Sequence, residues 1–137
     1  MKSVRIIHTG DMHFDSPWSG LPSDIAAIRK EEQLLTFSKI IDEAASADLL
    51  LICGDMLDGF SVSMQTLSHI KKCFERIPDT HIFISPGNHD YLCDNSPYNY
   101  FDFGKNVHIF NRELSCVELD HVRVYGAGFD ERYIKEP

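Results

Sequence analysis

The sequence contains no apolar run long enough to span a membrane, no internal repeat and no low-complexity segment. Its first residues lead directly into a β-branched run, so we do not expect a signal peptide. The four cysteines are spread along the chain and form no C-x-x-C pair, which argues against a zinc site or a disulfide framework. We therefore expect a cytoplasmic protein whose thiols are reduced.

Positive charge is also scarce. The chain has 13 Lys and Arg against 21 Asp and Glu, which gives a net charge of −8. This deficit argues mildly against nucleic-acid binding, because a phosphate backbone attracts Lys and Arg. Two bound divalent cations would offset about four of the negative charges. We expect the remaining acidity on solvated helix faces, around one domain whose 137 residues can bury a real core.

Apolar runs with strand and helix periodicity alternate along the first part of the chain, which predicts a parallel sheet with right-handed crossovers. Strands are predicted near 4–9, 49–53 and 81–85, and helices near 23–46, capped by Ser23 or Asp24, and 63–76. Further along, 107–110 reads as a short strand, and 115–119 with 122–125 as a hairpin. These later strands are predicted to begin a second sheet.

Polar residues follow a glycine-marked break at the end of each of the first three strands. They are Asp11 and His13 after the first strand, Asp55 after the second, and Asn88, His89 and Asp90 after the third. The carboxyl ends of parallel strands lie at one edge of a sheet, so these side chains should gather there. Clustered carboxylates without a cation are costly, and a pair of divalent metals would remove that cost. Taken alone, the third stretch could be a surface turn, in which Gly87 allows a left-handed conformation.

In this order, Asp11-Met12-His13, Gly54-Asp55 and Gly87-Asn88-His89-Asp90 resemble the D-x-H…G-D…G-N-H-[DE] series of calcineurin-like metallophosphoesterases. Residues 11–17, 54–58 and 106–110 are similar to the bacterial DNA-repair exonucleases of the SbcD/Mre11 type. The resemblance implies an α/β fold, the N-terminal half of a four-layer α/β/β/α sandwich. Its first sheet would be parallel βαβαβ, followed by the start of a second sheet, in one incomplete domain over residues 1–137.

The resemblance also implies a dinuclear metal site. Asp11 and His13 would hold the first metal, Asp55 would bridge both metals, and Asn88 would give the second a neutral oxygen. Mixed oxygen and nitrogen ligands suit Mn²⁺, Zn²⁺ or Fe, and the resemblance to nucleases favours Mn²⁺. The implied partners are DNA as substrate and an SMC-like ATPase subunit, with a homodimer as a further possibility and no membrane association.

Two catalytic residues follow from the same motif. His89 would face the scissile phosphate, where it stabilises charge or protonates the leaving oxygen, and Asp90 would orient His89. Five aromatic residues gather soon after: Tyr91, Tyr98, Tyr100, Phe101 and Phe103. They fit two interpretations equally, packing over the end of the sheet or forming a wall of the substrate cleft.

The chain departs from the family pattern in two places. Asp58 stands where some relatives carry histidine, although members of the exonuclease group also have Asp there. The later G-H and G-H-x-H motifs are absent, and His108 and His121 lack the flanking glycines. Three functions remain open: a DNA exonuclease or other phosphodiesterase, another phosphatase of the superfamily, and a non-catalytic assembly module. We expect the 137-residue chain to be nearly inactive, to bind one metal better than two, and to self-associate.

Overall fold

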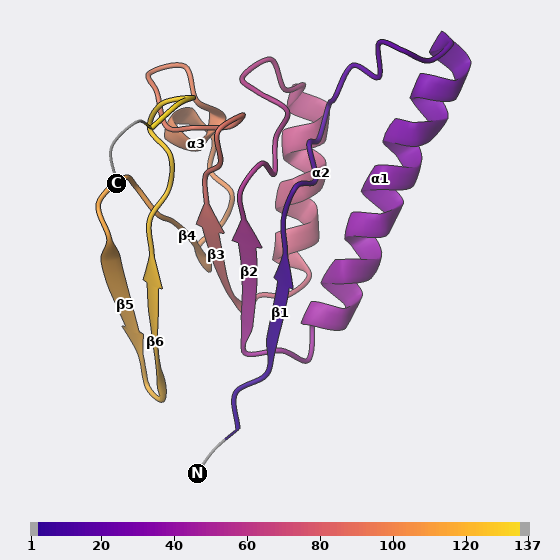
Figure 1. The fold of residues 1–137 in the computed structure, drawn as a ribbon. Helices are drawn as coiled ribbons and strands as arrows, with labels where there is room; N and C mark the ends of the chain where they lie inside the picture. The colour runs from indigo at the N-terminus through magenta and orange to yellow at the C-terminus, as the bar shows by residue number, and fades with distance from the viewer. Residues whose placement is uncertain (1–2, 135–137) are drawn as a thin grey trace.

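The computed structural model describes residues 3–134, which form one helical layer and two sheets (Figure 1). The first sheet is parallel, with strand order β1-β2-β3-β4, and the second is an antiparallel pair, β5-β6. The strands are β1 (Ile6–Thr9), β2 (Leu49–Cys53), β3 (His81–Ser85), β4 (Val107–Ile109), β5 (Ser115–Leu119) and β6 (Val122–Gly126). The helices are α1 (Ser23–Ala44), α2 (Met64–Glu75) and α3 (Pro97–Tyr100). The predicted α/β class and the start of a second sheet are confirmed.

The parallel sheet is covered on both faces. In Figure 1, α1 and α2 lie on one side of it and the β5–β6 hairpin on the other. Alternate residues of β2 divide accordingly: Leu50 and Ile52 pack in the cluster under the helices, and Leu49 and Leu51 pack against the hairpin. Burial on both faces explains why β2 is a continuous apolar run.

The strand β4 corrects one prediction. Residues 107–110 do not begin the second sheet, because β4 pairs in parallel with β3, Ile82 opposite Val107. The Asn106 side chain donates hydrogen bonds to the carbonyl oxygens of Ile77 and Thr80, at 3.0 and 2.9 Å. These bonds attach the start of β4 to the segment that leads into β3, and thereby add a fourth strand to the first sheet.

The two long helices begin differently. At α2 the Ser63 hydroxyl accepts a hydrogen bond from the Thr66 amide at 3.1 Å, which caps the helix. At α1 the capping position is occupied by Pro22, and no side chain caps the helix, so the predicted cap at Ser23 or Asp24 is wrong. Asp24 lies instead in the first turn, where its charge favours the helix dipole.

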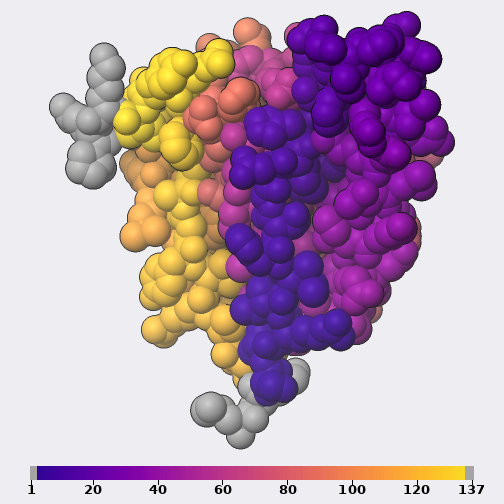
Figure 2. Space-filling view, turned by 45° about the vertical axis from the view of Figure 1, so that its right-hand side comes forward, coloured from indigo at the N-terminus to yellow at the C-terminus, as the bar shows by residue number. Residues whose placement is uncertain are grey.

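β1 is an edge strand of the parallel sheet. In Figure 2 the N-terminal segment lies at the surface between the hairpin and α1, and Ile6 is 48% exposed. None of the helices within residues 3–134 combines the length and the apolar character needed to cross a bilayer. Over the same residues all four cysteines are free thiols.

Candidate metal centre

The first two loops at the carboxyl ends of the strands are joined by backbone hydrogen bonds. The amide of Asp11 donates to the Gly54 carbonyl at 3.0 Å, and the amide of His13 donates to the Asp55 carbonyl at 2.8 Å. The Gly54 amide in turn donates to the Ser85 carbonyl at 2.8 Å, which connects β2 to the end of β3. The pairing of the sheet thus continues past the strands and brings three loops to one edge, as predicted.

His13 lies at the centre of the resulting cluster. Its Nε2 atom is 3.8 Å from Asp11 Oδ1 and 3.8 Å from Asp55 Oδ2. Its Nδ1 atom is 2.9 Å from Asp58 Oδ1. The ligand atoms form two groups, Asp11–His13–Asp55 and His13–Asp58–His89, and within each group they lie within 4.8 Å of one another. Three of the predicted metal ligands therefore meet around one point.

The backbone at these three residues is left-handed. The φ angles are 53° at Asp11, 48° at His13 and 51° at Asp55. Each such non-glycine residue costs about 1–2 kcal/mol relative to ordinary backbone. The inter-loop hydrogen bonds offset this strain, which is of the kind that gathers at functional sites.

Gly87 allows the third loop to approach Asp55. A Cβ atom at Gly87 would lie 2.2 Å from Asp55 Oδ1 and 2.6 Å from the Asp55 amide nitrogen. The same oxygen accepts a hydrogen bond from the His89 amide at 2.9 Å. Gly87 does not use the left-handed conformation that glycine allows, since its φ is not positive. Glycine is required here for close approach, not for its backbone angles.

Asp90 does not have the role that the motif predicts for it. Its side chain is completely buried and accepts four hydrogen bonds, none of them from the His89 ring. The donors are the backbone amides of Asp55 (3.2 Å), Leu57 (3.1 Å) and Gly87 (2.6 Å) and the hydroxyl of Tyr98 (2.6 Å). Asp90 therefore holds the second and third loops together from the protein interior. It does not orient His89. Burial, and then the nearby Asp90 charge, raise the pKa of the Tyr98 hydroxyl well above its ordinary value of 10.0.

His89 and Asn88 lie on the open side of the cluster. The His89 ring meets the His13 ring edge-on, with centroids 4.9 Å apart. Both His89 and Asn88 are half-buried and line the same pocket as Asp58. The structure thus places Asn88 beside the cluster, in the pocket that Asp58 and His89 also line. Its role as a ligand to a second metal stays a prediction.

The donor set suits a divalent cation. It offers one imidazole nitrogen and carboxylate oxygens at 3.8 Å, and the Asp11 side chain is 85% exposed and so accessible to an incoming ion. The two oxygens of Asp55 face different sides of the cluster. Its Oδ2 atom faces His13, and its Oδ1 atom faces the loop that carries Asn88 and His89. Mixed nitrogen and oxygen donors fit Mn²⁺, Zn²⁺ or Fe and do not select among them.

Asp58 belongs to the site although it was not among the predicted ligands. Its 2.9 Å contact with His13 Nδ1 is the arrangement in which a carboxylate orients a metal-binding histidine through the opposite ring nitrogen. Its position three residues after Asp55 was the available signal. Phe14 pairs with Leu57 in an isolated parallel bridge, and this pairing carries Asp58 alongside His13.

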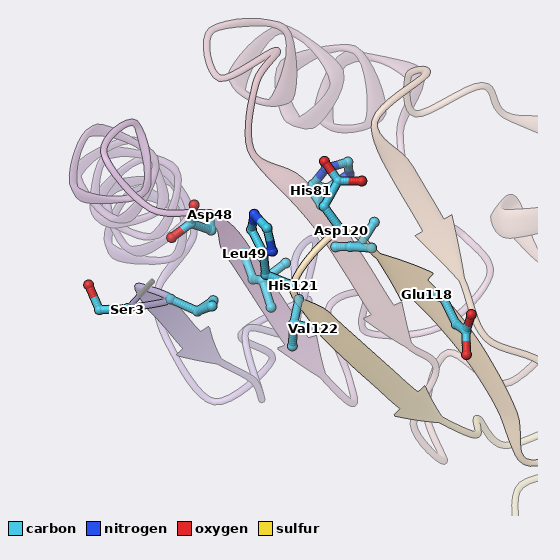
Figure 3. Close-up of a pocket in the computed structure, with 10 residues that line it drawn as sticks. Ser3, Asp48, Leu49, His81, Glu118, Asp120, His121 and Val122 are labelled. Carbon is cyan, nitrogen blue, oxygen red and sulfur yellow. The ribbon is translucent and has the colours of Figure 1, made fainter. Parts of the chain in front are cut away.

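A second cleft lies at the other end of the sheet. It has a volume of about 430 Å³ between the starts of β2 and β3 and the turn of the hairpin (Figure 3). His121, Asp48 and His81 line it, but within residues 3–134 the only converging groups of three His, Cys, Asp or Glu side chains are those around His13. His108 packs against the Phe110 ring, with centroids 4.7 Å apart. Neither His108 nor His121 joins the cluster.

Comparison with known proteins agrees with this geometry. The chain is 33% identical over 118 residues to the metallophosphoesterase YhaO of Bacillus subtilis (strain 168). That alignment covers 81% of this chain and 28% of the relative, so the chain spans less than a third of its length. A family model described as calcineurin-like phosphoesterase matches residues 4–134. These matches show the family and indicate no narrower group within it. With its strand-end cluster of Asp and His, the chain belongs to the calcineurin-like phosphoesterase family.

Proposed function

We propose that the protein is a metal-dependent phosphodiester hydrolase that acts on DNA. The observation that carries the proposal is the position of His89. Its backbone is hydrogen-bonded to Asp55, and its ring lies against His13, so an ionisable side chain stands beside the candidate metal ligands. Metal-dependent hydrolysis of a phosphodiester combines a bound metal that activates the phosphoryl group with a proton donor beside it.

The candidate ligands would divide between two ions. Asp11 and His13 would hold one, Asn88 would contribute to the other, and Asp55 would contact both. Bound divalent ions would polarise a phosphoryl oxygen and activate a water molecule for attack on phosphorus. Asp58 keeps the His13 ring oriented with Nε2 toward the carboxylates, since its own oxygen occupies the Nδ1 side.

His89 would act on the substrate itself. It would donate a hydrogen bond to a phosphoryl oxygen or a proton to the leaving oxygen. The position of His89 depends on the hydrogen bond from its amide to Asp55. The proton donor and the candidate metal ligands are therefore directly connected. Mn²⁺ is our proposed metal, and DNA our proposed substrate, from the resemblance to nucleases described above.

A substrate panel tests this function. Purified full-length gene product with Mn²⁺ should release nucleotides from duplex DNA ends, and EDTA should abolish the reaction. A mononucleotide and a phosphoprotein offered in parallel should be poorer substrates. His89→Ala should lower the rate at least a hundredfold, while His121→Ala, a histidine in the distant cleft, should have no effect. Preferred hydrolysis of the phosphoprotein or the mononucleotide would refute the choice of substrate, and no Mn²⁺-dependent hydrolysis of any of them would refute the function.

A further inference from the structure

A pocket of about 370 Å³ adjoins the candidate metal centre on the His89 side. Phe60, from the loop after β2, and Tyr91, from the loop after β3, both line it together with Asn88 and His89. The Phe60 and Tyr91 rings meet edge-on, with centroids 4.9 Å apart, and each is only half-buried. An aromatic pair thus stands next to the position expected for the scissile phosphate.

Arg132 brings a positive charge to the same pocket. The segment before it is fastened to the third loop, because the Phe129 amide donates to the Pro86 carbonyl at 2.9 Å and the Leu92 amide donates to the Phe129 carbonyl at 2.8 Å. Gly128 permits this approach, since a Cβ atom there would lie 2.5 Å from Pro86 Cδ. The placement of Arg132 is therefore tied to the loop that carries His89.

The guanidinium of Arg132 is available for a ligand. Each of the other arginines forms an ion pair with Asp or Glu: Arg5, Arg29, Arg76, Arg112 and Arg123. Among the residues that the structure describes, Arg132 has no such carboxylate partner, and its guanidinium lies over the Tyr133 ring, with Cζ 5.8 Å from the ring centroid. In a protein with a net charge of −8, a guanidinium beside the candidate active site that forms no ion pair within residues 3–134 attracts an anionic ligand.

We propose that Phe60, Tyr91 and Arg132 form a nucleotide-recognition pocket. The aromatic pair would contact a base, and Arg132 would bind a phosphate next to the scissile one. Bases stack on aromatic side chains without strong sequence preference, and guanidinium groups bind phosphate through paired hydrogen bonds. The inference rests on the proposed function and adds the residues that would hold the nucleotide beside the scissile phosphate. The preferred substrate carries a base and a second phosphate, as a nucleic-acid strand does and a simple phosphodiester does not.

The test compares two substrates and five proteins. The substrates are bis(p-nitrophenyl) phosphate, which has neither base nor second phosphate, and a 5′-phosphorylated oligothymidylate. The proteins are the full-length gene product and its variants Arg132→Gln, Tyr91→Leu, Arg123→Gln and Tyr125→Leu. The last two are matched controls on the outer face of the hairpin, where Tyr125 is 63% exposed. Arg132→Gln and Tyr91→Leu should each raise KM for the oligonucleotide about tenfold more than KM for the small ester. The two control variants should leave KM unchanged for both substrates.

Binding supplies a second measurement that does not require catalysis. Anisotropy of a fluorescein-labelled oligothymidylate, measured in EDTA, should show an affinity about tenfold lower for Arg132→Gln and Tyr91→Leu than for Arg123→Gln and Tyr125→Leu. Equal affinities across the four variants, or equal KM changes for both substrates, would overturn the pocket while leaving the hydrolase intact. A protein that hydrolyses neither ester would instead refute the proposed function, and the anisotropy series would then decide the pocket alone.

Discussion

Replacing Asp90 by Asn should destabilise the protein strongly, although the two side chains have nearly the same shape. Each carboxylate oxygen accepts two hydrogen bonds: Oδ1 from the amides of Asp55 and Gly87, and Oδ2 from the amide of Leu57 and the hydroxyl of Tyr98. An asparagine must place its NH₂ group where one of these oxygens was. With the NH₂ group at the Oδ1 position, the amides of Asp55 and Gly87 both face a donor. With the NH₂ group at the Oδ2 position, the Leu57 amide faces a donor, whereas the Tyr98 hydroxyl can rotate to accept.

The magnitude follows from the number of bonds lost. A hydrogen bond to a charged group contributes about 1.5–3 kcal/mol, so the loss of at least one should lower the free energy of unfolding by at least about 1.5–3 kcal/mol. Tyr98→Phe removes a single donor and should cost about 1.5–3 kcal/mol. Both effects are large against a typical total stability of about 5–15 kcal/mol.

Urea unfolding, followed by the fluorescence of Trp18, the single tryptophan, measures both costs. Tyr100→Phe is the matched control, because Tyr100 lies two residues from Tyr98 and is 59% exposed. It should change the stability by less than about 0.5 kcal/mol. If Asp90→Asn costs less than about 1 kcal/mol, or if Tyr98→Phe and Tyr100→Phe cannot be distinguished, Asp90 does not hold the loops together as argued.

Three further predictions concern the same loops. Asp55→Ala should reduce Mn²⁺ affinity in titration calorimetry about tenfold more than Asp11→Ala, because a bridging carboxylate contacts both ions; equal losses would argue against a bridge. Gly87→Ala should lower both the thermal midpoint and Mn²⁺ affinity, because the new Cβ would overlap Asp55, whereas Gly20→Ala, with nothing within 4 Å, should leave both unchanged; similar midpoints would contradict the close contact. Above pH 10 the unfolded chain loses the Tyr98 proton while the folded state retains it, so stability should fall as pH rises toward the folded pKa, by up to about 1.4 kcal/mol per pH unit. Tyr98→Phe should show a shallower fall between pH 9 and 11, and parallel curves would disprove a raised pKa.

The sheet and its site-bearing edge could be predicted because local patterns determine both. A continuous apolar run such as β2 has to be covered on both faces, and a crossover connection makes its neighbours parallel. A glycine-marked break after each strand then places Asp11, His13 and Asp55 at the same edge. These steps require only the period of the pattern and the position of the breaks.

The sequence-based predictions fail where contacts between segments distant in sequence determine the structure. The strand β4 is only three residues long, and its sequence does not indicate which strand it pairs with. The Asn106 side chain attaches it to the first sheet. Asp90 follows His89 directly, which suggested a catalytic pair, but the chain turns there so that Asp90 faces the interior. The turn sequence around Gly87 suggests a need for unusual backbone angles, whereas the restriction to glycine comes from contact with Asp55, which is distant in sequence.

The aromatic cluster after β3 shows why substrate contacts are harder to predict than metal ligands. Tyr98 packs in the core, as the packing interpretation predicts, whereas Tyr91 lines the pocket beside His89, and its place in the wall of a substrate cleft stays a prediction. Metal ligands come from strand ends, whose positions the sheet determines. Phe60 and Arg132 come from loops that are joined only in three dimensions, with more than seventy residues between them in sequence. A shared metal cluster is compatible with many substrates, so the choice among them has to be sought in these loops.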